Sequence, residues 1–218
     1  MKCVVVGNGA SLSVDQLDLI TGIPSIACNR INLIYPETKW RPTIYIHPES
    51  IAPDLSFIRE NIDLGIECYL GEHYARPPRG VMDLEDAPNI HWIKECHHHL
   101  QNFDSRDDLP DEWHLPQLCS FGGSVNMAMQ IAVLKGATEI ILIGCDLLYK
   151  NGKGKSHMHP DYEHGNEQPA FYASRNAFYG HVQALNWIRR KGKNINVFNA
   201  TRGGLLELWP RVNLNDIL

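Results

Sequence analysis

Short runs of apolar residues alternate with amphipathic stretches along most of the chain. The first run, Cys3 to Val6, is apolar throughout, which is typical of a strand buried on both faces of a parallel sheet. Because strand and helix patterns alternate, we expect an α/β fold with one doubly wound, mostly parallel, Rossmann-like sheet and the first strand at its centre. Further strands are expected over 25–28, 43–47, 66–70, 90–93, 139–144 and 195–199, and helices over 14–20, 29–34, 55–62, 124–134 and 173–190.

Two polar stretches interrupt this alternation. Residues 96–117 contain three consecutive histidines and two prolines, and we interpret them as a long excursion from the sheet. Residues 147–170 are rich in glycine and lysine and poor in apolar residues, so we expect a lid that is mobile without ligand and closes over a bound nucleotide. The prediction for residues 1–218 is therefore a single nucleotide-binding domain with a lid.

The loop after the first strand reads Gly7-Asn8-Gly9-Ala10-Ser11-Leu12. Its glycines allow a ligand to approach the backbone closely, and the helix expected next offers free N–H groups to a phosphate. A dinucleotide fingerprint is not supported, because Leu12 stands where the third glycine would be. An ordinary strand-to-helix turn that binds nothing explains these residues equally well.

Polar residues follow several of the expected strands at their carboxyl ends. Asn8, Asn29, His47 and Asp146 all fall at such positions. Ligands of open α/β sheets bind at this edge, so these four side chains are candidates for one site. Ser124, at the start of the central helix, is interpreted as a helix cap or a phosphate donor. No P-loop and no G-x-S-x-G nucleophile elbow occurs in the sequence.

Composition narrows the class of protein. The chain has 218 residues, of which 44% are hydrophobic, and 20 Lys and Arg against 25 Asp and Glu give a net charge of −5. We therefore expect no nucleic-acid partner and, without a long apolar stretch, no membrane span. A homo-oligomer is left open. With no signal-peptide pattern, we expect a cytoplasmic protein whose six scattered cysteines are free thiols.

A cluster of histidines lies in the expected lid. His157, His159, Asp161 and His164 have a spacing similar to that of metal ligands, and a histidine also suits general-base catalysis near neutral pH. Loop histidines often serve neither role, so we expect no metal site. His181 falls within an expected helix, where packing is its commoner use.

Taken together, these pieces resemble the bacterial sialyltransferases of glycosyltransferase family 42. The family's opening loop is similar to 7–12, its second strand ends in Cys-Asn as Cys28-Asn29 does, and its central helix begins at a Ser as at Ser124. Gly-x-Asp and Tyr-x-Asn-Gly then follow in order as 144–146 and 149–152. The chain departs from the pattern at Ala10, where the family has proline, and at His47, where the family has asparagine.

The resemblance implies a transferase that moves a sugar from a CMP-activated donor to an acceptor hydroxyl, with no required cofactor. Asn8, Asn29 and Ser124 would contact phosphate and ribose, and Asp146 would lie near the nucleoside. Tyr149 would stabilise the leaving phosphate, and His159 or His164 would be the base. The full set of implied nucleotide-binding residues is Gly7, Asn8, Gly9, Ser11, Asn29, Ser124, Gly144 and Asp146.

Two alternatives remain open. The MptE-like pterin diphosphokinases share the opening motif, and their chemistry would bring in Mg²⁺ as a cofactor. A non-catalytic nucleotide-binding protein would keep the cleft and lack the base.

Overall fold

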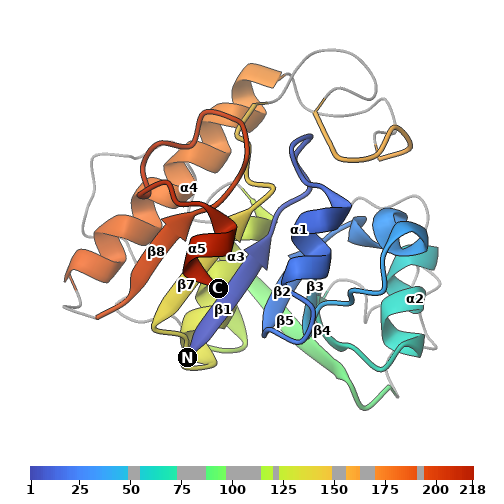
Figure 1. Ribbon diagram of the computed structural model, residues 1–218. Helices are drawn as coiled ribbons and strands as arrows, with labels where there is room; N and C mark the ends of the chain where they lie inside the picture. The colour runs from blue at the N-terminus through green and yellow to red at the C-terminus, as the bar shows by residue number, and fades with distance from the viewer. Residues whose placement is uncertain are drawn as a thin grey trace.

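The computed structural model describes residues 1–48, 55–72, 87–96, 114–119, 123–148, 156–162, 170–190 and 194–218. These residues form an eight-stranded sheet with the order β6-β5-β4-β3-β2-β1-β7-β8, in which every neighbouring pair is parallel (Figure 1). The strands are β1 (Lys2–Val6), β2 (Ser25–Cys28), β3 (Ile44–His47), β4 (Glu67–Gly71), β5 (Ile90–Cys96), β6 (Gln117–Cys119), β7 (Glu139–Ile143) and β8 (Asn196–Asn199). The helices are α1 (Val14–Leu19), the 3₁₀ helix η1 (Ile31–Glu37), α2 (Ser56–Asp63), α3 (Ser124–Leu134), α4 (Ala170–Arg190) and α5 (Leu214–Ile217).

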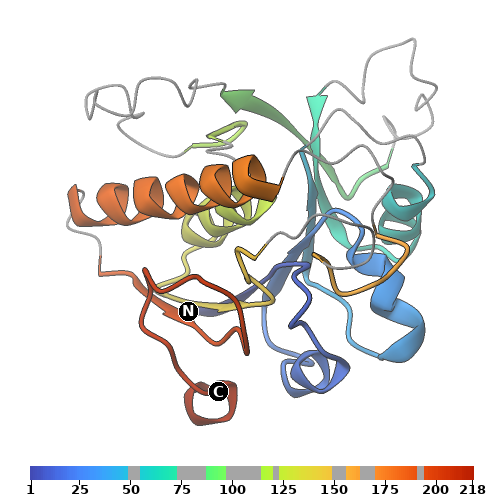
Figure 2. The ribbon, with the colours of Figure 1, turned by 90° about the horizontal axis from the view of Figure 1, so that it is seen from above.

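The sheet is covered on both faces. Helices α3 and α4 lie on one face, and α1, η1 and α2 lie on the other (Figure 2). Side chains of β1 alternate between two cores: Cys3 and Val5 pack with the α3 and α4 side, whereas Val4 and Val6 pack with the α1 side. The apolar run at the start of the chain is therefore a strand buried on both faces, which confirms the prediction of a doubly wound α/β fold.

The chain changes direction across the sheet at β1. Strands β2 to β6 follow one another outward on one side of β1, and β7 and β8 lie on its other side. This makes the carboxyl ends of β1 and β7 the topological switch point, the usual ligand position in such sheets. The first strand thus lies inside the sheet, displaced toward the β8 edge.

Three local predictions are wrong. The helix after β2 is a 3₁₀ helix that continues through Pro36, because a missing N–H interrupts only one bond of so short a helix. Strand β6 was not predicted: it begins at Gln117, the last residue of the segment interpreted as an excursion, and its three residues are too few to give a periodic pattern. Cys119 is disulfide-bonded rather than free, and the sheet register pairs its Cα with that of Cys96, a proximity that sequence spacing does not reveal.

Among the described helices, none combines the length and the apolar character that crossing a membrane requires.

Candidate functional site

A row of buried polar side chains crosses the carboxyl ends of β1, β2 and β3. Asn8, His47 and Ser124 are each less than a tenth exposed, and Asn29 lies between them. Asn29 has the left-handed backbone conformation, with φ of 54°, which asparagine tolerates better than most residues. Buried polar groups are costly unless they are hydrogen-bonded, so the contacts within this row define what it can bind.

Asn8 is only partly satisfied by the protein. Its Nδ2 donates to the carbonyl oxygen of Cys28 at 2.9 Å and contacts the Tyr162 hydroxyl at 3.1 Å. Its Oδ1 is buried and has no hydrogen-bond partner among the described residues. The amide nitrogen of Asn8, a residue that the resemblance to family 42 would place against phosphate and ribose, is thus already engaged. The atom of Asn8 that can still take part in a hydrogen bond is the acceptor Oδ1.

Asn29 connects the second and third strands to helix α3. Its Oδ1 accepts from Ser124 Oγ at 3.2 Å and lies 3.1 Å from His47 Nδ1. Since a carbonyl oxygen only accepts, His47 Nδ1 carries the proton there, and its Nε2 carries the lone pair. The hydroxyl of Ser124 donates to Asn29 and is not activated by the histidine.

Asp146 forms hydrogen bonds to two loops at the topological switch point. Its Oδ2 accepts from the Ser11 hydroxyl at 2.9 Å and from the Ser11 amide at 3.3 Å, while its carbonyl oxygen accepts from the Leu205 amide at 2.7 Å. A Cβ built on Gly9 would lie 1.8 Å from Asp146 Oδ2, so only glycine allows this approach. Asp146 therefore joins the loops after β1, β7 and β8.

Several hydrogen-bond donors of the glycine loop (residues 7–12) are therefore already engaged within the protein. The amides of Gly7 and Gly9 donate to the carbonyl oxygens of Ile143 and Gly144, both at the end of β7. The Ser11 amide and hydroxyl donate to Asp146. The described contacts make this loop a structural junction between β1 and β7 as well as a candidate ligand loop.

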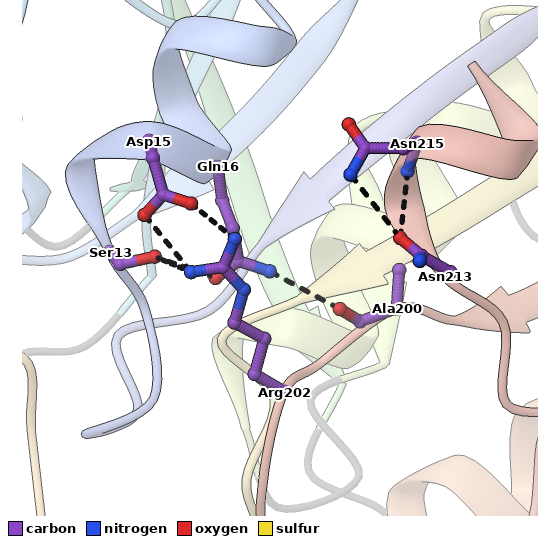
Figure 3. A network of polar contacts seen from close by, with 7 residues as sticks. All are labelled: Ser13, Asp15, Gln16, Ala200, Arg202, Asn213 and Asn215. Atoms are coloured by element: carbon purple, nitrogen blue, oxygen red, sulfur yellow. Dashed lines mark hydrogen bonds and ion pairs between the residues drawn. The ribbon is translucent and has the colours of Figure 1, made fainter.

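The start of α1 is also occupied (Figure 3). Arg202 forms an ion pair with Asp15, in the first turn of the helix, and donates to Ser13 Oγ at 3.0 Å. These hydrogen bonds lower the pKa of Asp15 to about 2. Gln16 donates to the carbonyl oxygen of Ala200 at 3.2 Å, so the helix is joined to the segment after β8. A carboxylate thus already occupies the N-terminus of this six-residue helix.

Residues 156–162, which we name the covering segment, lie against the glycine loop. His157 forms an antiparallel bridge with Gly9, and the Met158 amide donates to the carbonyl oxygen of Asn8 at 2.9 Å. The rings of His157 and Tyr162 stack with centroids 3.9 Å apart. This part of the expected lid therefore lies against the candidate site.

The candidate catalytic residues are only partly described. Tyr149 and His164 lie outside the described residues. His159 Nδ1 accepts from the Asp161 amide at 3.1 Å, so a neutral His159 carries its proton on Nε2 and can take another only after releasing that amide. His181 is buried, as its helical position suggested: its Nδ1 accepts from Trp209 Nε1 at 3.2 Å, and burial lowers its pKa to about 4.

Sequence reasoning missed Arg30, the cation that directly follows Asn29. Its Nη1 donates to the carbonyl oxygens of Asp161 and Tyr162, the latter at 2.8 Å. Its position after a strand-end asparagine was the available signal.

The described residues contain no cluster of three or more His, Cys, Asp or Glu arranged to hold a metal ion. Among the described residues, Cys3, Cys68 and Cys145 are thiols outside any disulfide, and burial raises the pKa of Cys3 and Cys68 to about 12 and that of Cys145 further. These three thiols remain protonated at neutral pH and are poor nucleophiles.

Comparison with known proteins gives one relationship, at the level of the fold. No protein-family model matches the chain, and no curated protein is significantly similar to it. The chain is similar to the structure of MAf glycosyltransferase from Magnetospirillum magneticum AMB-1, with a TM-score of 0.59 and 15% sequence identity. The match covers 100% of this chain and 34% of that protein, so the chain spans about a third of its length. The chain thus has a distant structural likeness to part of a glycosyltransferase, whereas the resemblance to family 42 stays a prediction.

Proposed function

We propose that the chain is a glycosyltransferase that binds a CMP-activated sugar and transfers it to an acceptor hydroxyl. The observation that carries the proposal is the row of polar side chains formed by Asn8, Asn29 and His47 at the carboxyl ends of β1 to β3 and by Ser124 at the start of α3, of which all but the half-buried Asn29 are buried. Such a row is costly in an apolar core and is compensated when a polar ligand completes its hydrogen bonds. The likeness in fold to a glycosyltransferase supports the reaction class.

Transfer from a nucleotide sugar needs two functions. The charge on the leaving phosphate must be stabilised, and the acceptor hydroxyl must lose its proton as it attacks. We assign the first to Tyr149 and the second to His159 or His164 from the resemblance to family 42. For His159, catalysis requires a local rearrangement that releases the Asp161 amide.

The proposal is tested by ligand-induced thermal stabilisation followed by a turnover assay. CMP or CDP should raise the melting temperature without added metal, and CMP should be released from a CMP-linked sugar faster when an acceptor is present. Stabilisation by ATP only with Mg²⁺ would favour a diphosphokinase. Stabilisation by CMP without any turnover would favour a non-catalytic nucleotide-binding protein.

A further inference from the structure

Asn8 Oδ1, an acceptor, and Arg30 Nε, a donor, are buried atoms at the candidate site that lack a hydrogen-bond partner among the described residues. Leaving a buried polar atom unsatisfied is costly, and more so when the group is charged. A guanidinium has only N–H donors, so Arg30 Nε can be satisfied only by an acceptor.

Arg30 is also uncompensated in charge. In the described part of the chain it forms no ion pair with a carboxylate, and the oxygens that its Nη1 contacts are main-chain carbonyls of the covering segment. The other arginines near the sheet edge differ: Arg202 pairs with Asp15 and Arg211 with Glu207. Arg30 is therefore a half-buried cation with no anionic partner in the part of the chain that the structure describes.

Tyr162 contacts both residues, each through an atom other than the unsatisfied one. Its hydroxyl contacts Asn8 Nδ2 at 3.1 Å, and its carbonyl oxygen accepts from Arg30 Nη1 at 2.8 Å. Asn8 and Arg30 are thus linked through one residue of the covering segment. The covering segment contacts Nδ2 of the Asn8 amide and Nη1 of the Arg30 guanidinium. Asn8 Oδ1 and Arg30 Nε have no hydrogen-bond partner among the described residues.

From this arrangement we infer that Asn8 and Arg30 form a two-point site for a ligand that carries a hydroxyl group and an anionic oxygen at a short separation. The hydroxyl donates to Asn8 Oδ1, and the anionic oxygen accepts from Arg30 Nε. A ribose phosphate carries both groups. Arg30 is then the residue that holds the phosphate of the nucleotide, a role that the glycine loop, with its amides engaged by β7 and Asp146, is less able to fill.

This inference rests on the proposed function for the choice of CMP as probe, but the site itself is defined by hydroxyl and anion. The test is calorimetric titration of the wild type, Arg30→Gln and Arg189→Gln with CMP and with cytidine. Arg189 is a matched control, because it is an exposed arginine in α4 close to the end of that helix, at the opposite edge of the sheet.

We expect Arg30→Gln to weaken CMP binding at least tenfold and to leave cytidine binding unchanged, whereas Arg189→Gln should match the wild type for both. Arg30→Lys, which keeps the charge and lacks the guanidinium fork, should give an intermediate loss for CMP alone; it also serves if Arg30→Gln fails to fold. Equal CMP affinity in the wild type and either Arg30 variant overturns the inference.

The hydroxyl contact has its own test. The 2′-deoxy or the 3′-deoxy form of CMP should bind at least fivefold more weakly than CMP to the wild type, and this difference should disappear in Asn8→Ala. Persistence of the full difference in Asn8→Ala overturns the assignment of the hydroxyl to Asn8.

Failure of the inference and failure of the proposed function are distinguishable. If the wild type does not bind CMP, the same variants are titrated with AMP, UMP and ribose 5-phosphate. Binding of one of these that depends on Arg30 keeps the two-point site and rejects the CMP donor. Absence of any Arg30-dependent binding rejects both.

Discussion

At the scale of single residues, the carboxyl edge of the sheet contains two kinds of polar group. Asp146 and Ser11 are satisfied by each other and have a structural role, whereas Asn8 and Arg30 each retain one unsatisfied atom. The sequence indicated that these residues lie at strand ends, and could not show which ones bond to each other. Residue type and position alone therefore do not separate a ligand contact from a structural one.

The contact between Gly9 and Asp146 gives a prediction at this scale. Gly9→Ala places a Cβ in the space that Asp146 Oδ2 fills, so we expect the free energy of unfolding to fall by roughly 1–3 kcal/mol, as for other overpacked sites. Gly123→Ala is the control, because no described atom lies within 4 Å of its Cβ and its φ of 172° is extended. Urea unfolding followed by circular dichroism measures both; equal stability of the two variants would contradict the structural role of Gly9.

At the scale of secondary-structure elements, two packing contacts decide how the site is held. Helix α4 packs against the loop after β8 through His181 and Trp209, and the covering segment packs against the loop after β1 through His157 and Met158. The first contact lies in a core and the second lies at the edge of the candidate site. We therefore expect the first to govern stability and the second to respond to ligand.

The buried His181 makes stability depend on pH. Its pKa is about 4 in the folded protein against an ordinary value of 6.5, because burial disfavours the charged ring. Between these values the unfolded chain binds a proton that the folded protein does not, so stability falls as pH is lowered from 6.5 toward 4, by on the order of 3 kcal/mol. The neutral form accepts from Trp209, and His181→Asn keeps an acceptor without titrating.

The measurement is the urea midpoint between pH 7 and 4. His181→Asn should lose much of the pH dependence that the wild type shows in this window, whereas His114→Asn, at an exposed position, should keep it. The same slope in the wild type and in His181→Asn would show that His181 is not the group responsible.

The covering segment should become more ordered when nucleotide binds. Its described contacts with the glycine loop are few, and local openings of such segments cost little free energy. We expect amide hydrogen exchange over residues 156–162 to slow in the presence of CMP, while exchange in β8 stays the same. Unchanged exchange in the covering segment at saturating CMP would contradict its role as part of a lid.

At the scale of the whole molecule, the sheet is shared by both helical layers. Val4 and Val6 contribute to one core and Cys3 and Val5 to the other, so neither layer can lose its packing without exposing the same strand. Apolar runs and strand-end residues sufficed to predict most strands and both helical faces. Other features depend on contacts between residues distant in sequence, which no local pattern contains. They are the register of β6, the disulfide at Cys119 and the hydrogen bond from Arg30 to the carbonyl oxygen of Tyr162.

This shared sheet predicts a single cooperative unfolding transition. Trp40 belongs to the core on the α1 side, and Trp187 to the core on the α4 side. Subtracting the fluorescence of Trp40→Phe from that of the wild type gives the signal of Trp40, and the same subtraction with Trp187→Phe gives the signal of Trp187. Their urea transitions should coincide with each other and with far-ultraviolet circular dichroism; separate midpoints would show that the layers unfold independently.

The position of β1 has a consequence for synthesis on the ribosome. One edge of β1 pairs with β2, which is made almost at once, but the other edge pairs with β7, where Lys2 is matched with Glu139. At about 5–20 residues per second, the apolar strand Lys2–Val6 waits roughly 7–30 s for that partner. During this interval its backbone N–H and C=O groups are open to pairing with another chain. Nascent chains should therefore depend most strongly on a chaperone, or on wide spacing between neighbouring ribosomes, until β7 has emerged from the ribosome.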